Sequence, residues 1–348
     1  MNMSENKEAK TFKIVVVGGG TGTYTVLKGL TKYLPEVELS AVVTMADSGG
    51  STGRLRDTFG YLPVGDVRMA LVALAREDDE HERLLRDLFS HRFNTGGEMK
   101  GHTFGNLLLT ALRDMLGSES EAISVAARIL GARGRVLPVT LGNTHLVAEY
   151  DDGLVITGES LIDSPESERV GRRIVALSVE PRHPANPLAL EAIANADMIV
   201  IGPGDLYTSV LANCVVTDVA KTIADSQAML VYVSNLMSRP GQTRGMSVGD
   251  HVLEIEHYLG RKVDKVLYND TPLPVKVLER YRLEGDEPLV VRDNDDLNDR
   301  LIRADLLDDV SAEPVPGDAL KRSLIRHDSE KLADVLVGNC IKSNYNSD

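Results

Sequence analysis

Apolar runs rich in β-branched residues alternate along this chain with segments whose apolar residues recur every three or four positions. The first pattern is typical of strands buried on both faces, and the second of helices with one buried face. We expect strands at residues 13–17, 39–44, 135–139, 145–150, 154–156, 173–179, 197–201, 229–233 and 263–268. We expect helices near residues 23–34, 66–76, 80–92, 104–116, 119–131, 187–195, 208–225, 247–259 and 318–336. This alternation predicts an α/β fold with a doubly wound, mostly parallel, Rossmann-like sheet.

The interval of about 135–180 departs from this alternation. Its strands are short and are separated by Asp-Asp-Gly and Gly-Glu-Ser, which predicts a small β-rich excursion from the main sheet. No internal repeat is visible, and residues 11–340 are predicted to form a single domain. The composition of residues 1–10 and 341–348 is that of flexible tails.

Composition excludes several classes of function. The net charge of −14 argues against nucleic-acid binding, which needs a basic surface. No apolar run approaches the roughly 20 residues that a membrane span requires. The polar N-terminal stretch lacks the apolar region of a secretory signal, and Cys214 and Cys340 lack metal-ligand spacing. The two cysteines are therefore expected to be free thiols in a reducing compartment, which predicts a cytoplasmic protein.

The first expected strand runs into a loop with four glycines in five residues. Such a loop lets the backbone approach a ligand and aims amide groups at an anion near a helix N-terminus. A tight turn without a ligand explains a single loop of this kind equally well. The dinucleotide motif G-x-G-x-x-G is only half met, because Thr23 stands at its last position. The predicted phosphate-binding residues are Gly18, Gly19, Gly20, Thr21 and Gly22.

A second loop with glycine and serine follows the expected strand 39–44. Asp47 stands where a ribose-binding acid would be, but the sequence after it suits a phosphate or a metal-bound phosphate better. Asp47 could instead only cap the segment that follows. The candidate ligands of this loop are Asp47, Ser48, Gly49, Gly50 and Ser51, with Asp47 as a candidate metal ligand.

Two further motifs precede expected helices. Asp66 is a natural cap, whereas Arg68 in a first helical turn opposes the helix dipole and more plausibly faces an anion. His102 and Asn106 stand in a polar turn before an apolar helix, where they could contact a phosphate or be structural.

Two later strand ends carry similar loops. Gly202, Gly204 and Asp205 follow one buried strand, and Asn235 follows the next. The carboxyl ends of parallel strands meet at one edge of a sheet. We therefore expect these residues to share a crevice with the two N-terminal loops.

These motifs, in this order, resemble the CofD-like (2-phospho-L-lactate transferase) superfamily, and more closely its gluconeogenesis-factor branch. The resemblance rests on Gly-Gly-Gly-Thr-Gly, Ala-Asp-Ser-Gly-Gly-Ser, Pro-Val-Gly-Asp-Val-Arg, Lys-Gly-His-Thr-Phe-Gly-Asn and Gly-Pro-Gly-Asp-Leu-Tyr, and it covers roughly residues 12–270. Ser48 and Met69 depart from the family pattern, which usually has Asp at the first position and often Asn at the second. The loss of the first carboxylate argues against a two-carboxylate metal site within that loop.

The resemblance implies a function as well as a fold. The gluconeogenesis-factor branch implies a cytoplasmic regulator that binds a nucleotide or nucleotide sugar and supports cell shape and growth on gluconeogenic carbon sources. The alternative is a transferase that moves a phospho-acyl group from a nucleotide diphosphate donor to an alcohol with Mg²⁺. A dehydrogenase is disfavoured because the dinucleotide motif is broken. The resemblance leaves a homodimer and a regulatory protein partner open.

Overall fold

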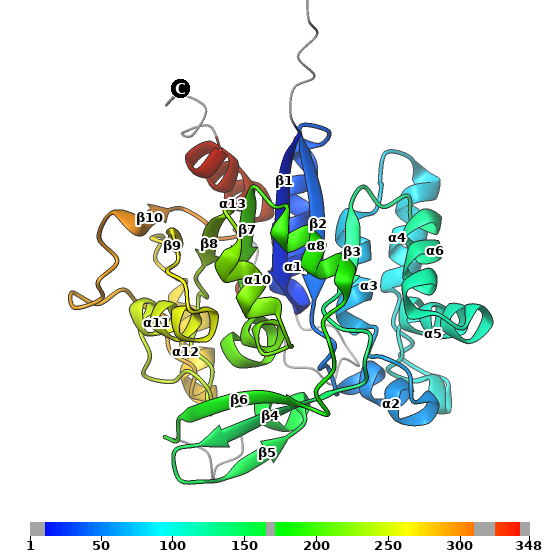
Figure 1. Cartoon of the computed structure of the whole chain (residues 1–348), viewed down its shortest axis with the longest axis horizontal. Helices are drawn as coiled ribbons and strands as arrows, with labels where there is room; N and C mark the ends of the chain where they lie inside the picture. The colour runs from blue at the N-terminus through cyan, green and yellow to red at the C-terminus, as the bar shows by residue number, and fades with distance from the viewer. Residues whose placement is uncertain (1–10, 165–170, 310–323, 342–348) are drawn as a thin grey trace, which may run out of the picture.

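The centre of the protein is a sheet of seven parallel strands, seen in a computed structural model that describes residues 11–164, 171–309 and 324–341. The strand order across the sheet is β10 (Leu301–Ala304), β9 (Lys265–Asn269), β8 (Met229–Val233), β7 (Met198–Ile201), β1 (Phe12–Gly18), β2 (Val37–Val43) and β3 (Arg135–Pro138) (Figure 1). The predicted α/β class with a parallel sheet is confirmed.

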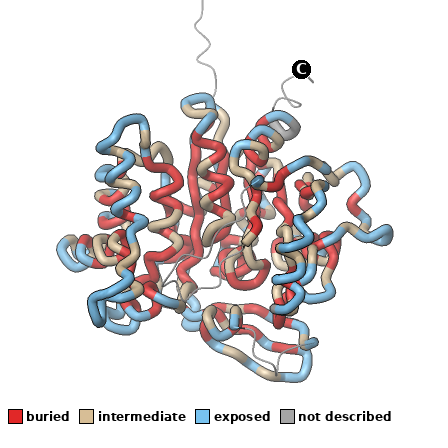
Figure 2. The backbone as a smooth tube through the Cα atoms, turned by 180° about the vertical axis from the view of Figure 1, so that it is seen from behind, coloured by how far each residue is buried: buried red, intermediate tan, exposed pale blue. Residues whose placement is uncertain are grey.

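Helices cover both faces of this sheet. Alternate residues of β1 point to opposite faces, so Ile14 and Val16 enter one hydrophobic layer while Val15 and Val17 enter the other. Figure 2 shows that these central strands are buried. The first layer is completed by α1 (Gly20–Leu30), α3 (Gly65–Leu74), α4 (Glu80–Ser90), α5 (Phe104–Leu116), α6 (Glu119–Ile129) and α13 (Ser329–Val335).

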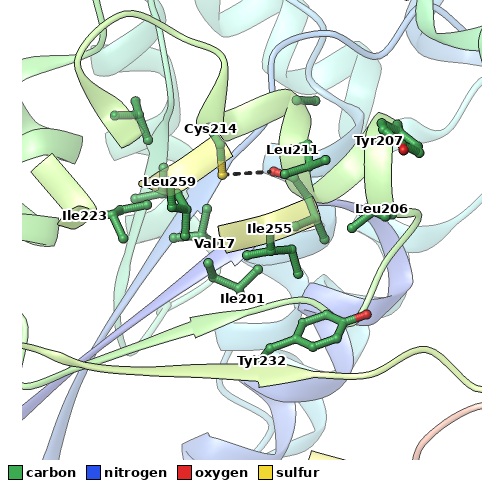
Figure 3. Packing of buried hydrophobic residues seen from close by; sticks show 14 of the residues in the cluster. Val17, Ile201, Leu206, Tyr207, Leu211, Cys214, Ile223, Tyr232, Ile255 and Leu259 are labelled. Carbon is green, nitrogen blue, oxygen red and sulfur yellow. Dashed lines mark hydrogen bonds between the residues drawn. The ribbon is translucent and has the colours of Figure 1, made fainter. Parts of the chain in front are cut away.

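The second layer is completed by helices from the later part of the chain and by a small sheet. These helices are α8 (Pro187–Ala194), α9 (Ala212–Cys214), α10 (Val219–Asp225) and α11 (Val248–Leu259). Figure 3 shows Val17 and Ile201 from neighbouring strands packed among these side chains, where the thiol of Cys214 donates to the Val210 carbonyl at 3.7 Å. Burial raises the pKa of Cys214 to about 12, so this thiol stays protonated.

The small antiparallel sheet lies beyond the carboxyl ends of the parallel strands (Figure 1). Its strands are β5 (Val155–Thr157), β4 (His145–Tyr150) and β6 (Ile174–Glu180), and α7 (Glu159–Asp163) follows β5. β3 belongs to the main sheet, where Arg135 pairs with Ser40. The β-rich excursion therefore begins at His145, about ten residues after the expected start.

Several elements differ from the expected ones. The glycine-rich segment after Asp47 becomes a helix, α2 (Gly50–Phe59), and two segments for which no element is expected form α12 (Val275–Glu284) and β10. The helix expected over 208–225 is broken into a π-helical turn (Leu206–Leu211), α9 and α10, with positive φ at Asp218. The last helix begins at Ser329 rather than at 318, and residues 318–323 lie outside the described residues. The tails expected at 1–10 and 341–348 also lie outside them, except for Ile341. Within the described part of the chain, no helix is long and apolar enough to cross a membrane.

Helix α1 crosses α13 at a point where only glycine fits. A Cβ atom on Gly29 would lie 1.8 Å from the backbone oxygen of Ser329, and this oxygen cannot move without displacing α13. The contact brings the end of the described chain against the first helix, next to the central strand.

We predict that Gly29→Ala lowers the free energy of unfolding by about 1–3 kcal/mol, because α13 must shift away from α1. Urea unfolding measures the loss. Gly338→Ala is the matched control, since a Cβ atom there meets nothing within 4 Å. An equal loss in the two variants would contradict the close crossing.

Candidate functional site

A cleft of about 580 Å³ opens at the carboxyl edge of the main sheet. It lies where β1 pairs with β7, the point at which the strand order turns in opposite directions. Ligands of open parallel sheets bind at such a switch point. A smaller pocket of about 180 Å³ adjoins the cleft and shares with it Gly20, Thr21, Asp205, Ser209, Arg239 and Asp286.

The first glycine loop forms the base of the cleft at the N-terminus of α1. Gly20 has a φ of +63°, and a side chain there would point into open space. The Gly20 amide donates to the Asp66 carboxylate at 2.8 Å. A Cβ atom on Gly22 would lie 1.9 Å from the Pro203 carbonyl oxygen, so this glycine lets the loops after β1 and β7 meet.

The second loop is shorter than the sequence suggested. Asp47 accepts from the Gly49 amide at 2.9 Å, and α2 begins at Gly50. The hydroxyl of Ser48 lies 3.1 Å from that of Ser160 and accepts from the Ser160 amide at 3.0 Å. Ser48 therefore joins the loop to α7, and it is not among the residues that line the cleft.

A chain of polar contacts links three predicted residues to a histidine behind them. Arg68 donates through Nε to Asn106 at 2.9 Å, and Asn106 donates to the Ser51 hydroxyl at 3.2 Å. The Ser51 hydroxyl lies 3.0 Å from Nδ1 of His102. His102 is buried, and desolvation together with Arg54 and Arg92 lowers its pKa, so the imidazole is neutral. His102 positions Ser51 and does not line the cleft.

The loop after β7 is held by the loop after β8. Asn235 accepts from the Gly204 amide at 3.2 Å and donates to the Gly204 carbonyl at 2.8 Å. This exchange fixes the backbone around Gly204, one residue before Asp205 reaches the cleft. Asn235 itself lines the smaller pocket.

Arg239, also from the loop after β8, connects the main sheet to α7. It donates through Nε and an NH2 group to the two carboxylate oxygens of Asp163, at 3.0 and 2.7 Å. Its Nε also lies 3.8 Å from Asp205. The pKa of Arg239 is raised by these carboxylates, Asp205 first, so the guanidinium remains charged. The bidentate pair holds α7 over the cleft.

The cleft contains more carboxylates than cations. Its described lining includes three arginines, Arg68, Arg92 and Arg239, and six acids: Asp47, Asp66, Glu159, Asp163, Asp205 and Asp286. Desolvation raises the pKa of Asp47, of Glu159 and of Asp205, while Arg56 and Arg68 partly oppose the rise at Asp47. Desolvation and the neighbouring Asp47 raise the pKa of Asp66 to about 7.

The carboxylate of Asp47 lies against Gly65 and that of Asp66 against Gly19, and the two are close enough for Asp47 to raise the pKa of Asp66. A Cβ atom would lie 2.5 Å from an Asp47 oxygen at Gly65, and equally close to an Asp66 oxygen at Gly19. The described residues contain no group of three metal-ligating side chains. The pair fits Mg²⁺, which needs few protein carboxylates when phosphate oxygens and waters complete its shell. The family pattern has a second acid directly after Asp47, where this chain has Ser48. In the structure Asp66 of α3 supplies a second carboxylate instead.

One hydroxyl in the cleft is left without a partner. Thr208 is 2% exposed and lines the cleft, and its Oγ1 has no hydrogen bond within the described residues. A buried hydroxyl without a partner costs free energy unless a ligand completes it.

The structure thus places most of the predicted residues at the two pockets. The cleft is lined by Gly20, Thr21, Asp47, Gly49, Ser51, Asp66, Arg68, Asn106 and Asp205, and the smaller pocket also by Gly19, Gly22, Gly204 and Asn235. Gly18, Ser48, Gly50, His102 and Gly202 are among the lining residues of neither. A Cβ atom on Gly18 would lie 2.6 Å from the Thr23 hydroxyl, so this glycine serves packing.

Sequence reasoning missed several residues that line the cleft. Arg239 lies in the same strand-end loop as Asn235, but the sequence predicts only Asn235 as a site residue. Thr208 comes three residues after Asp205, the last residue of the Gly-Pro-Gly-Asp motif. Glu159 and Asp163 lie in α7, which follows β5 of the small sheet, and they carry no local signal because only the tertiary fold brings α7 to the cleft.

A polar, glycine-lined cleft at the switch point of a parallel sheet is the place where α/β proteins with open, doubly wound sheets hold their ligands. The chain belongs to the CofD family, since the family model described as 2-phospho-L-lactate transferase CofD matches residues 14–307.

Relatives over nearly the whole chain agree with this assignment. A Thermotoga maritima protein, provisionally described as a gluconeogenesis factor, is 44% identical over 93% of this chain and 98% of its own length. The Bacillus subtilis gluconeogenesis factor is 38% identical over 93% of this chain and 97% of its own. A crystal structure of a UPF0052 family protein from Bacillus halodurans matches with a TM-score of 0.83 and 36% identity, covering 94% of this chain and 99% of that one.

We predict that Asp66→Asn stabilises the protein at pH 8 by up to about 4 kcal/mol and has little effect near pH 4. The folded pKa of about 7 lies above the ordinary 3.8, so the folded state loses stability as the pH rises between these values. The amide keeps an acceptor for Gly20 but carries no charge. Urea unfolding across this pH range measures the difference. Asp78→Asn, at an exposed site outside the cleft, is the control and is expected to show no such pH-dependent gain.

Proposed function

We propose that this chain is a cytoplasmic regulatory protein that binds a nucleoside diphosphate or a nucleotide sugar in the cleft. The observation that carries the proposal is the cleft at the switch point. There the space next to Gly20 at the N-terminus of α1 is open, and the buried Thr208 hydroxyl has no hydrogen-bond partner among the described residues. A helix N-terminus favours a phosphate, and the volume of about 580 Å³ is within the range of small-molecule sites.

The charge of the cleft bears on the form of the ligand. A bare diphosphate would meet six acids and only three arginines. A divalent cation held by Asp47 and Asp66 would reduce this imbalance and could bridge the carboxylates to the phosphate oxygens. We therefore propose that the ligand binds with Mg²⁺.

The proposed role of the protein is to report this ligand to a partner protein, in support of cell shape and growth on gluconeogenic carbon sources. The gluconeogenesis factors among its relatives support that role. The cleft supports regulation over catalysis, because none of its described lining residues is aromatic. A transferase that accepts a large flat alcohol would need an apolar, aromatic surface.

A phospholactate-transferase activity is the second candidate, favoured by the paired carboxylates of Asp47 and Asp66. Such a pair can hold a metal ion that stabilises charge on phosphates during group transfer. Turnover of guanosine-diphospho-lactate with the deazaflavin alcohol would establish this candidate and overturn the purely regulatory one.

We predict that calorimetry detects binding of UDP-glucose or GDP, and that EDTA weakens it at least tenfold. Gly20→Val should reduce the affinity at least tenfold, because the added side chain enters the cleft at its base. Gly260→Val is the matched control: Gly260 also has positive φ and open surroundings, but it ends α11 away from the cleft. The proposal is overturned if neither probe binds with or without Mg²⁺, or if the two variants lose affinity equally.

We also predict that the chain restores growth and rod shape to a Bacillus subtilis strain that lacks its own gluconeogenesis factor, on a gluconeogenic carbon source. The Gly20→Val variant should fail at equal abundance, as judged by immunoblot, whereas Gly260→Val should succeed. If both variants restored growth and shape, the cellular role would not depend on the cleft, and this part of the proposal would be wrong.

A further inference from the structure

A second cavity, of about 640 Å³, lies at the edge of the main sheet. It opens beside the edge strand β3, between α6 on one face and the start of α8 on the other. It shares no lining residue with the cleft at the switch point. Its volume is within the range of sites for small organic ligands.

The lining of this cavity is basic. Arg76, Arg128, Arg133 and Arg135 line it, and no Asp or Glu is among its described lining residues. None of these four side chains makes a hydrogen bond or an ion pair with the residues that the structure describes. The concentration of unpaired cations contrasts with the net charge of −14 of the whole chain. Such a cavity attracts anions by its local field.

The backbone between α6 and β3 holds these arginines in place. Gly131 turns the chain with a φ of +58°, and a Cβ atom there would lie 3.3 Å from Cδ of Arg76. Arg76 therefore lies across the turn. The Arg133 amide donates to the Leu74 carbonyl at 2.9 Å, which docks the turn on the end of α3.

Arg133 contributes a buried donor without a partner. Its Nε is shielded from solvent and has no hydrogen bond among the described residues. Buried donors are nearly always satisfied in proteins, so this Nε is open to an acceptor that the described residues do not supply. The positive charge of Arg133 also acts on Lys28, whose pKa is lowered by desolvation, by Arg86 and by Arg133.

The rest of the wall is apolar. Ile123 and Ala127 of α6 face the cavity together with Val136 of β3, and Leu188 of α8 is 44% exposed beside them. Apolar surface among unpaired guanidinium groups suits a molecule with a hydrocarbon or ring portion and two or more anionic groups.

We propose that this cavity is a second ligand site, which binds a small organic polyanion such as a phosphorylated or polycarboxylate metabolite. Arginine at Arg135 and proline at Pro138 could also protect an edge strand from pairing with another chain. That role accounts for residues on β3, but not for Arg76 and Arg128, which come from other elements, or for the buried Nε of Arg133.

The test uses naphthalene-1,5-disulfonate, a fluorescent probe with an apolar body and two anionic groups. We expect saturable binding with one site per chain, weakened at least tenfold by the double variant Arg128→Ala/Arg135→Ala. Both side chains are exposed, so the variant should fold, which urea unfolding verifies. Arg280→Ala/Arg282→Ala removes the same charge from exposed positions on α12 and should bind the probe like the unmodified protein.

Two further measurements separate this site from the cleft. UDP-glucose should not displace the probe, and Gly20→Val should bind the probe normally, whether or not the proposed function holds. Absence of saturable binding, displacement by UDP-glucose, or equal losses in the two double variants would overturn the proposal. If the Arg128/Arg135 variant binds the probe normally but self-associates in sedimentation, these arginines protect the edge and the proposal is wrong.

Discussion

The backbone contact between Gly22 and Pro203 is the constraint on which the site depends. The connections after β1 and β7 leave the sheet toward opposite faces, and a crevice forms only if both begin close to the sheet edge. At Gly22 the clearance is so small that a single Cβ atom would lie 1.9 Å from the Pro203 oxygen. The start of α1 is thereby set against the loop that carries Asp205, and the exchange of hydrogen bonds between Asn235 and Gly204 keeps that loop in place.

The small antiparallel sheet and α7 cover the cleft from the side opposite the main sheet. The small antiparallel sheet brings α7 to the cleft, where Asp163 is held by Arg239 and Ser160 by Ser48. Each contact joins residues more than 70 positions apart in the chain. The cleft is therefore assembled from distant parts of the chain. Desolvation raises the pKa of Asp66, Glu159 and Asp205, which lowers the cost of placing these acids together. A bound cation would favour the charged form of the acids next to it and so lower their pKa.

Local patterns were sufficient for the sheet and for the positions of the strand-end loops. Continuous apolar runs located β1, β2, β7 and β8, and the glycine after each run located residues such as Gly20 and Asp205 at the cleft. Local patterns were insufficient for residues whose position depends on the direction of a side chain or on a contact with a distant part of the chain. Ser48 turns to α7, and His102 stands behind Ser51, because burial and partner choice decide these directions. α2 was missed since its glycines resemble a loop, although they let the helix start against the cleft.

The position of β1 has a consequence for how the protein is made. Although β1 is the first strand in the chain, one of its two neighbours, β7, follows about 180 residues later, and Lys13 donates from its amide to Asp197 at 2.9 Å. During synthesis β1 can pair with β2 early, but its other edge stays unpaired until β7 has left the ribosome. A buried, β-branched strand with an open edge is prone to wrong pairing during that interval. The second edge of β1 is covered only when β7 pairs with it, and α13 can pack on α1 only after nearly the whole chain has been synthesised.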